Sequence, residues 1–347
     1  MKRVFLLLLN ILLIAEFVVY SADKDKNIPL KVFTLHETDI TDCEKQLDEN
    51  EVFFKTLTGF EMDDQGNLYY LECNYATIYK VDMNSGKLLK TISSRGQGPG
   101  QLNRPTAMTV KKGKIFVLDI GFGGIKVFDT DGKCLKEFRV GNANVYSISL
   151  FLNQIIAAND NNEIFVRELD EKDNTVISVF DSDGKRLKSI IPINAQKEKD
   201  LKLWVLNTDF VFKIDKNGDL ILLYKKKGEL KKYDCNGKLS WERNLYSDLP
   251  VQDKNKEKFE VVNKKHLFQV SMRFDFLGFG FTEAGDIFVS TYRGGIYYDK
   301  SGNPLFILKQ PSGESFGDLF VWNKDDLITP YKIFRLKDIK GGINVKN

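Results

Sequence analysis

The first candidate for ligand binding is a glycine-rich stretch from Arg95 to Pro105. Its sequence is Arg-Gly-Gln-Gly-Pro-Gly-Gln-Leu-Asn-Arg-Pro. A glycine-rich loop binds nucleotide phosphate when it opens a helix, because the first amides of the helix then face the phosphate. Here Pro99 and Pro105 bracket a loop that enters another strand-like run, so the stretch fits neither a helix nor a central strand. The pattern predicts a connector between two strand-rich segments.

Two Asp-x-Asp-Gly segments, Asp129–Gly132 and Asp181–Gly184, could open a calcium-binding loop. Such a loop needs further oxygen ligands and a Glu at its twelfth position. The chain has Val140 and Pro192 at those positions. Because the same spacing recurs along the sequence, it indicates hairpin turns instead.

The chain has few histidines and cysteines that could take part in catalysis or metal binding. The two histidines, His36 and His266, are not part of a Gly-x-Ser-x-Gly elbow, so the sequence indicates no Ser-His-Asp set. The four cysteines are too scattered for a zinc ribbon or a Cys-x-x-Cys redox site, and we expect buried free thiols at Cys43, Cys73, Cys134 and Cys235. We therefore predict no catalytic residues and no cofactor, and the sequence does not support a divalent metal in a central channel.

The charge balance bears on the class of partner. Lys and Arg total 51 against 48 Asp and Glu, which leaves a net charge of +3 over 347 residues. Nucleic-acid binding usually requires a concentrated basic surface. The sequence therefore predicts no nucleic-acid partner.

The N-terminus has the pattern of a targeting segment. Lys2 and Arg3 precede an apolar run from Val4 to Tyr20, and Ser21 is followed by polar residues. The run is shorter than the approximately 20 apolar residues of a membrane span and is interrupted by Asn10 and Glu16. We predict a cleaved signal peptide over residues 1–21 and an exported protein (periplasmic, cell-surface or extracellular), with a retained membrane anchor as the alternative.

Two kinds of turn repeat along the rest of the chain. The first kind occurs six times and precedes a β-like run: Asp64–Tyr69, Lys112–Phe116, Leu152–Ile156, Lys216–Ile221, Ala284–Phe288 and Asn323–Ile328. The second kind is an aromatic residue or Val, then Asp, a short gap and Gly: Val81–Gly86, Phe128–Gly132, Phe180–Gly184, Tyr233–Gly237 and Tyr298–Gly302. Turns of this kind between alternating apolar runs predict hairpins. A unit of four strands (a to d) with a period of about 40–50 residues is typical of a β-propeller blade.

The count of turns predicts how the ring closes. Six first turns against five second turns indicate that the last blade lacks its outer strand. We expect the β-like segment from Leu30 to Leu35 to supply it, because pairing the two ends removes an open sheet edge. The chain is thus predicted to be all-β, with residues 22–347 forming a six-bladed β-propeller of four-stranded antiparallel blades, closed by an N-terminal strand. Asp160–Asn174 is expected to be an extra stretch in the third blade.

A known family pattern occurs in the part of the chain from Gly96 to Lys133. It comprises Gly96–Leu102, Pro105, Ile115–Asp119 and Ile125–Lys133. This pattern is a Gly-Pro-Gly-Gln connector, a Pro, a hydrophobic strand ending in Asp and a strand ending in Phe-Asp-x-x-Gly. The chain resembles the NHL-repeat-like six-bladed β-propeller family, most strongly over the first two blades. The resemblance implies a binding or sensing scaffold, as in many exported bacterial propellers. Some related propellers are lyases and lactonases that depend on a metal in the central channel.

The predicted topology places the b–c loops and the d–a connectors on one face. That face would gather Asn74-Tyr75, Arg95–Arg104, Gly121–Gly124, Asn159–Asn162, Lys225–Lys227 and Tyr292–Gly294. Exposed Tyr, Phe and Arg are common in recognition surfaces. The candidate binding residues are therefore Tyr75, Arg95, Asn103, Arg104, Phe122, Tyr292 and Arg293.

The sequence thus predicts a non-enzymatic, monomeric, exported scaffold that binds a protein, peptide or glycan through this face. One alternative is a channel-centred, metal-dependent enzyme of the lyase or lactonase type. A second alternative is a membrane-tethered sensor domain, in which residues 1–21 are retained and form the only membrane contact.

Overall fold

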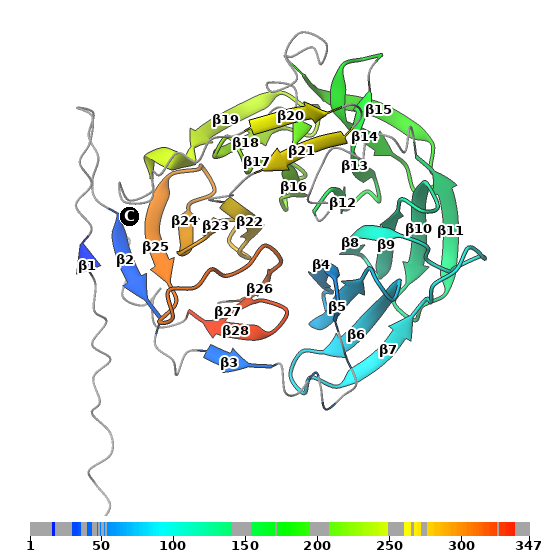
Figure 1. The fold of residues 1–347 in the computed structure, drawn as a ribbon, viewed down its shortest axis with the longest axis horizontal. Helices are drawn as coiled ribbons and strands as arrows, with labels where there is room; N and C mark the ends of the chain where they lie inside the picture. The colour runs from blue at the N-terminus through cyan, green and yellow to red at the C-terminus, as the bar shows by residue number, and fades with distance from the viewer. Residues whose placement is uncertain are drawn as a thin grey trace, which may run out of the picture.

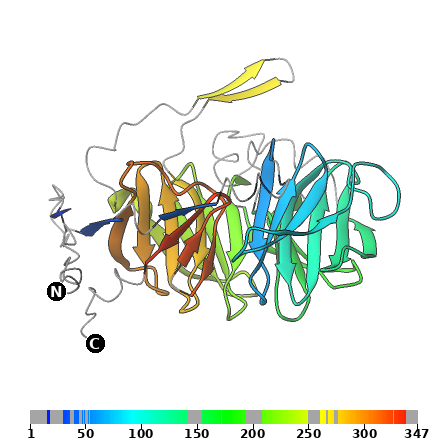
Figure 2. The same ribbon diagram turned by 90° about the horizontal axis from the view of Figure 1, so that it is seen from below.

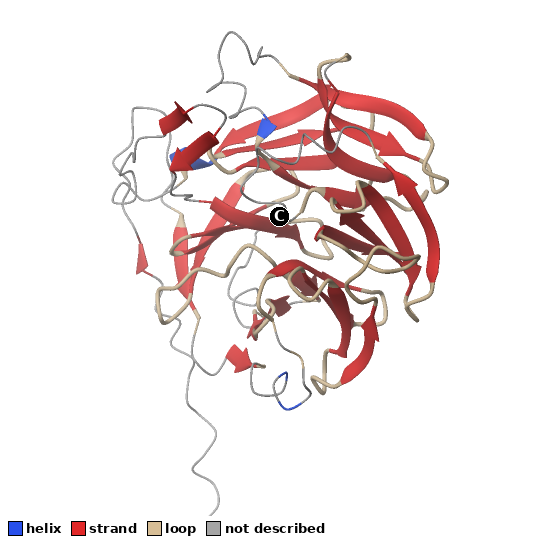
Figure 3. Ribbon diagram, turned by 45° about the vertical axis from the view of Figure 1, so that its right-hand side comes forward, coloured by secondary structure: helices blue, strands red, loops and turns tan. Residues whose placement is uncertain are grey.

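The computed structural model describes residues 16–17, 30–35, 40–43, 47, 49, 52, 54–140, 154–170, 172–193, 208–248, 260–264, 267–271, 276–324 and 326–336. Six β-sheets are arranged as blades around a central axis, and strands make up most of the described chain (Figures 1 and 3). The predicted six-bladed β-propeller with four-stranded antiparallel blades is confirmed.

The first three blades follow one another along the chain, and each is a meander from an inner to an outer strand. Blade 1 consists of β4 (Leu57–Met62), β5 (Asn67–Glu72), β6 (Thr77–Asp82) and β7 (Leu88–Ile92). Blade 2 consists of β8 (Pro105–Lys111), β9 (Lys114–Asp119), β10 (Gly124–Asp129) and β11 (Cys134–Arg139). Blade 3 consists of β12 (Ile156–Ala158), β13 (Ile164–Asp170), β14 (Thr175–Phe180) and β15 (Arg186–Pro192).

The second half of the ring is similar but carries additions. Blade 4 consists of β16 (Val211–Ile214), β17 (Leu220–Tyr224), β18 (Glu229–Tyr233) and β19 (Leu239–Asn244), and is followed by a 3-10 turn, η3 (Leu245–Ser247). A separate hairpin, β20 (Glu260–Lys264) and β21 (Leu267–Ser271), lies between blades 4 and 5 in the chain. Blade 5 contains β22 (Phe276–Phe281), β23 (Ile287–Thr291), β24 (Gly294–Tyr298) and β25 (Pro304–Lys309). Blade 6 contains β26 (Val321–Asn323), β27 (Asp326–Ile328) and β28 (Lys332–Arg335).

Ring closure is performed by an N-terminal strand, but not by the segment that the sequence suggested. β3 (Ile40–Asp42) pairs antiparallel with β28 and becomes the outer strand of blade 6. The Leu30–Leu35 segment instead forms β2 (Lys31–Thr34), which pairs parallel with β25 at the edge of blade 5. β1 (Glu16–Phe17) then pairs with β2. β2 takes this position because Val32, Phe33 and Leu35 are buried there, being at most 3% exposed.

The position of the first turn in blade 3 also differs from the prediction. The predicted first turn, Leu152–Ile156, overlaps β12, and the turn actually lies at Asn159–Glu163. Asp160–Asn174 is not an extra stretch, because it contains β13. The apolar residues Ile156 to Ala158 form the buried inner strand, which the buried Ile155 precedes, and the polar residues that follow form the turn.

Asp or Asn at the first position explains why the turns recur so regularly. Asp129 Oδ1 accepts hydrogen bonds from the backbone N–H groups of Asp131 (3.0 Å) and Lys133 (2.8 Å). Asn159 Oδ1 accepts the same pair from Asn161 (3.0 Å) and Glu163 (2.9 Å). Such local side-chain bonds stabilise turns. The predicted hairpin role of the Asp-x-Asp-Gly segments is confirmed.

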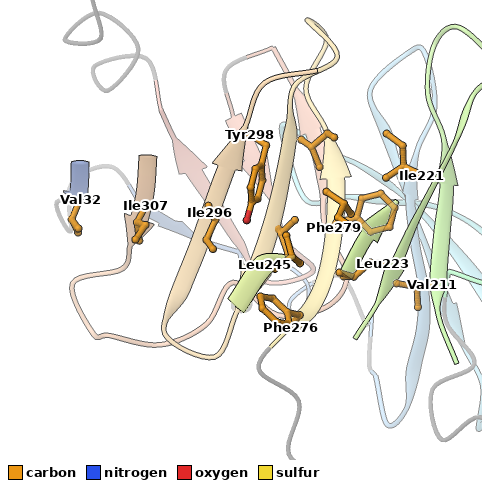
Figure 4. Close-up of a cluster of buried hydrophobic side chains, with 13 residues drawn as sticks. Val32, Val211, Ile221, Leu223, Leu245, Phe276, Phe279, Ile296, Tyr298 and Ile307 are labelled. Carbon is orange, nitrogen blue, oxygen red and sulfur yellow. The ribbon is translucent and has the colours of Figure 1, made fainter. Parts of the chain in front are cut away.

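The core lies between adjacent blades. The strands β9 and β17 are buried along almost their whole length, because a neighbouring blade covers each of their faces. One core cluster joins blade 4 to blade 5 through Leu223, Leu245, Phe276 and Phe279 (Figure 4). Among the described residues, no helix is long and apolar enough to cross a membrane.

Candidate functional site

The two faces of the ring differ in what they carry. Within each blade the chain direction places the a–b and c–d turns on one face, and the b–c loops and d–a connectors on the other, which we call the loop-bearing face. The β20–β21 hairpin belongs to the connector from blade 4 to blade 5 and stands off this face (Figure 2). Residues 141–153 and 194–207 belong to two further d–a connectors and lie outside the described residues.

Three exposed tyrosines lie on b–c loops of the loop-bearing face. Tyr75 is 51% exposed, Tyr292 48% and Tyr331 40%. They belong to blades 1, 5 and 6, which ring closure makes consecutive (Figure 1). We call Tyr292, Tyr331 and Tyr75 the tyrosine arc. The other exposed large hydrophobic side chains of the described residues are leucines on the outer strands of blades 1 to 5.

Tyr331 was not among the residues predicted from the sequence. It lies in the loop between β27 and β28 of the incomplete last blade, next to Pro330. Its ring packs edge-on against Phe54, with 5.9 Å between the ring centroids. A proline between two short apolar runs was the available signal, since it marks a turn.

Arg95 and Asn103 lie on the loop-bearing face, but their hydrogen bonds are internal. The Arg95 guanidinium donates to the backbone carbonyls of Asn74 (2.5 Å), Asn103 (3.2 Å) and Cys73 (3.3 Å). It thereby joins the b–c loop of blade 1 to the connector that leads to blade 2. The Asn103 side chain lies against Gly121, where an added Cβ would come within 2.7 Å of Asn103 Nδ2. Both residues support the surface more than they extend from it.

The same connector is closed by Gln101. Its Oε1 accepts the N–H of Gly98 (3.0 Å), and an added Cβ on Gly96 would lie 2.0 Å from this oxygen. The N–H of Gly100 donates to Glu137 Oε1 on β11 (2.8 Å). These contacts give the Gly-Pro-Gly-Gln stretch the connector role that the sequence predicted.

Phe122 is half-buried between two cations. The Lys126 Nζ lies 4.7 Å from the Phe122 ring centroid, and the Arg139 Cζ lies 4.1 Å from it. Lys126 is 1% exposed and forms a 2.9 Å ion pair with Glu137. The Phe122 ring therefore covers the buried lysine of an ion pair, which favours a packing role.

The predicted residues fall on blades 5, 1 and 2, and blade 6 between blades 5 and 1 carries none of them. Tyr292 and Arg293 lie on blade 5, Tyr75 on blade 1, Arg95 to Arg104 on the next connector and Phe122 on blade 2. Phe122 and Tyr292 lie on facing blades, so they are not neighbours. Tyr75, Arg95, Arg104, Tyr292 and Arg293 are exposed. These five, with Tyr331, make up the accessible part of the candidate site, although the Arg95 guanidinium is bonded to backbone carbonyls.

Acidic residues at the ends of the second strands act as clamps. The carboxylate of Asp119, which is 0% exposed, accepts the N–H groups of Asn103 and Arg104 (both 2.8 Å) and of Gly121 (3.0 Å). Glu72 has the same role in blade 1, where its carboxylate accepts the N–H groups of Lys55 and Tyr75. These carboxylates hold the loops and are not arranged as an acid–base pair.

A charged cluster lies where the channel meets the loop-bearing face. Asp209 Oδ2 is 2.8 Å from Lys226 Nζ, and Asp209 Oδ1 is 3.7 Å from Arg167 Nη1. Burial lowers the pKa of the adjacent Lys225 to about 8, although Asp318 and Asp209 oppose the shift. The sequence predicts a loop at Lys225–Lys227 but gives no sign that acidic residues distant in the chain meet it.

Gln154 crosses the channel at this end. Its Nε2 donates to the backbone carbonyl of Asp318 (2.8 Å), and these two residues precede the inner strands of blades 3 and 6, which face each other. Gln154 has a left-handed backbone with φ of 53°, which is uncommon for a residue other than glycine. The contact fixes the connector of blade 6 over the channel.

The described residues hold no group of three or more His, Cys, Asp or Glu side chains placed to bind a metal ion. His36 and His266 lie outside the described residues. The four cysteines are free, as predicted, but they are not buried: Cys43, Cys73 and Cys134 are partly exposed and Cys235 is exposed. Burial raises the pKa of the Cys43, Cys73 and Cys134 thiols, so these thiols are weak nucleophiles.

Comparison with known proteins gives no family assignment. No protein-family model matches the chain, and no curated protein matches it. Among solved structures, virginiamycin B lyase from Staphylococcus aureus is similar at a TM-score of 0.48 and 11% identity, over 80% of this chain and 78% of that one. A protein of unknown function from Bacteroides caccae is similar at 0.43 and 12%, over 74% and 82%. Hydrazine synthase from Kuenenia stuttgartiensis is similar at 0.43 and 13%, over 72% and 78%.

These similarities carry no argument about what this chain does. The propeller architecture rests on the pairing of its own strands.

Proposed function

We propose that the protein is an NHL-repeat-like, exported and non-enzymatic propeller scaffold that binds a protein, peptide or glycan at the tyrosine arc. The observation that carries the proposal is the placement of three exposed tyrosines on b–c loops of three consecutive blades, on one face. Tyrosine presents a rigid apolar ring with a polar tip, and it is enriched in the centres of binding interfaces. The three rings lie on loops of neighbouring blades, so a partner that spans these loops could contact all of them.

Arginines extend this contact area at both ends. Arg293 follows Tyr292 on blade 5, and Arg104 lies on the connector beyond blade 1; both are exposed. Guanidinium groups bind carboxylates with two parallel hydrogen bonds. We therefore expect the partner to combine aromatic or apolar groups with at least one acidic group.

The fold supports this role by holding the loops in fixed positions. Glu72 accepts the backbone N–H of Tyr75, and Asp119 holds the start of β8 next to Arg104. A preorganised surface binds with a smaller loss of conformational entropy than a mobile one.

The test compares two triple variants that remove equal numbers of exposed hydrophobic side chains. The first changes Tyr75, Tyr292 and Tyr331 to Ser, and the second changes the outer-strand Leu89, Leu135 and Leu187, each 46% exposed, to Ser. Peptide-display libraries and a glycan array are screened with the unmodified protein, and each ligand found is measured against both variants.

We expect the tyrosine variant to lose at least about tenfold in affinity, because one hot-spot residue alone contributes about 2 kcal/mol. The leucine variant should bind normally. Equal binding by the tyrosine variant and the unmodified protein would contradict the proposed site. Both variants should fold, since the changes are on the surface.

Export is the second part of the proposal. It is supported by the basic and apolar pattern of residues 1–21, of which the structure describes only β1. Intact-mass measurement of protein recovered outside the cytoplasm should give a mature chain that begins at Ala22. A chain that retains residues 1–21 and fractionates with membranes would favour the tethered sensor instead.

A further inference from the structure

Three aromatic side chains meet between blades 6 and 1, near the loop-bearing face. Tyr331 lies on the b–c loop of blade 6, Tyr79 lies on β6 close to the b–c loop of blade 1, and Phe54 lies in the segment that leads into β4. The Phe54 ring centroid is 5.9 Å from that of Tyr331 and 6.1 Å from that of Tyr79. None of the three side chains is buried. We call these three residues the aromatic corner.

The rings of the aromatic corner stand at steep angles to one another. Tyr79 and Tyr331 are inclined by 70° and 71° to Phe54. The buried Tyr70 stacks on Phe54 at 18°, with 4.8 Å between the centroids, so it covers one face of the Phe54 ring. A sugar ring stacks flat on an open aromatic face, whereas crossed rings offer edges and slots. The arrangement therefore favours a ligand with narrow apolar ridges over a glycan.

Hydrogen bonds hold the loop that carries Tyr331. The N–H of Cys43, next to β3, donates to the carbonyl of Tyr331 (2.7 Å). The Tyr70 hydroxyl donates to the carbonyl of Pro330 (3.3 Å). The b–c loop of blade 6 is thus tied to the N-terminal strand and to blade 1. Binding to such a fixed surface costs less conformational entropy than binding to a mobile one.

The polar groups beside the aromatic corner favour a neutral ligand that accepts hydrogen bonds. Burial raises the pKa of Tyr79, and Glu72 and Tyr75 add to the shift, which places the Tyr79 hydroxyl near the b–c loop of blade 1. Glu72 is 0% exposed, and its carboxylate accepts the N–H groups of Lys55 and Tyr75, so it is not available to pair with a cation. Tyr75, which is 51% exposed, adds a phenol at the edge of the corner.

We propose that the aromatic corner binds a proline-rich segment of a partner protein in the polyproline II conformation. Such segments dock into aromatic-lined grooves. Their proline rings form narrow apolar ridges, and their backbone carbonyls have no internal hydrogen bonds, so tyrosine hydroxyls can donate to them. The inference rests on the proposed function of the tyrosine arc, to which Tyr75 and Tyr331 belong, and it names the class of partner.

The probe is an end-blocked hexaproline peptide, which is about 19 Å long in this conformation. It is compared with a flexible (Gly-Ser)₃ peptide of the same length and with the glycan maltohexaose, by calorimetry on the purified protein. We expect hexaproline to bind with a Kd below about 1 mM and the other two compounds not to bind. Absence of hexaproline binding at millimolar concentration, equal binding of all three compounds, or binding of maltohexaose alone would overturn the inference.

Variants locate the bound peptide. Tyr331→Ala should weaken hexaproline binding about tenfold or more, as expected for a central aromatic contact. Phe54→Leu keeps an apolar side chain and should weaken binding several-fold through loss of the ring. Tyr292→Ala is the control, because Tyr292 is 48% exposed on the corresponding loop of blade 5 but lies outside the corner. Unchanged affinity in both Tyr331→Ala and Phe54→Leu, or an equal loss in Tyr292→Ala, would refute the proposed position.

The NMR signals of the peptide provide a readout that a purely structural role would not change. Proline ring protons that lie over an aromatic face move upfield, so the hexaproline signals should shift upfield with the unmodified protein and not with Tyr331→Ala. Bound hexaproline without such a shift would overturn the inference.

Failure of this inference is distinguishable from failure of the proposed function. If hexaproline does not bind while the ligands from the display and glycan screens still require the three tyrosines, only the proline-rich partner is wrong. If those ligands bind the triple tyrosine variant normally, the proposed function itself is wrong.

Discussion

Asp119→Ala is expected to be among the most destabilising substitutions in the first half of the ring. The Asp119 side chain is completely buried at the end of β9, and its carboxylate accepts hydrogen bonds from Asn103, Arg104 and Gly121. It also accepts one from the N–H of Phe122 (3.2 Å). Alanine removes every acceptor of this set.

The expected loss of stability depends on whether each N–H donor finds another acceptor once the Asp119 carboxylate is removed. A hydrogen bond to a charged group contributes about 1.5–3 kcal/mol, but neighbouring bonds are not additive. Phe122 keeps a second acceptor, the backbone carbonyl of Asp119 (3.1 Å), and the exposed Arg104 and Gly121 can reach water. We therefore expect a loss of about 3–5 kcal/mol, the range found when one partner of a buried charged contact is removed.

The measurement is urea unfolding, with Asp131→Ala as the control. Asp131 lies on the exposed turn after β10 in the same blade, so its substitution should change the free energy of unfolding by less than about 0.5 kcal/mol. Asp119→Asn should fall between the two, because its amide group replaces one acceptor with a donor that faces the N–H of Asn103. If Asp119→Ala were as stable as Asp131→Ala, the assignment of this carboxylate as a clamp would be wrong.

Two further predictions concern the ends of the ring and the channel. Removal of residues 1–29 should leave the free energy of unfolding unchanged. Removal of residues 1–35 should lower it by about 5 kcal/mol, because this truncation also removes the buried Val32, Phe33 and Leu35. Equal urea midpoints for the two truncations would contradict the docking of β2 on β25. Burial lowers the pKa of Lys225 from 10.5 to about 8. Between these two pH values the unfolded chain therefore binds more protons than the folded one. The free energy of unfolding should rise with pH over this range, by up to about 3 kcal/mol. The rise should be absent in Lys225→Met and present in the control Lys216→Met, and identical pH profiles of the unmodified protein and Lys225→Met would refute it.

The repeating turns were predictable because each one is a local structure. The side chain of Asp129 bonds to backbone groups two and four residues further along the chain, so its role can be read from a short window of sequence. Apolar runs between such turns are sufficient to predict strands and a blade of four. Blade 3 shows the limit of this approach: the pair Asn153-Gln154 and the pair Asn159-Asp160 both look like turns, and only the packing of Ile155 to Ala158 in the core decides between them.

The assignment of candidate binding residues was only partly predictable, because exposure depends on neighbours from other parts of the chain. Arg95 and Phe122 are of the types that recognition surfaces use, but Arg95 bonds to carbonyl groups of another loop and Phe122 covers the Lys126–Glu137 pair. Tyr331 was missed because the last blade lacks the second kind of turn, whose Asp-x-x-Gly pattern marks the strand after each b–c loop in the other blades. No local pattern shows that Tyr331 lies between Tyr292 and Tyr75 on the ring.

The sequence alone determined the class of fold, the number of blades and the face that carries the longer connections, since all three follow from turn chemistry and chain direction. The tertiary structure decided which N-terminal segment closes the ring, because β2 and β3 are both short β-like runs and differ only in the edge against which each one packs. It also decided the candidate binding region. The tyrosine arc combines Tyr75 of the first blade with Tyr292 and Tyr331 of the last two, and these blades become neighbours only when the ring closes.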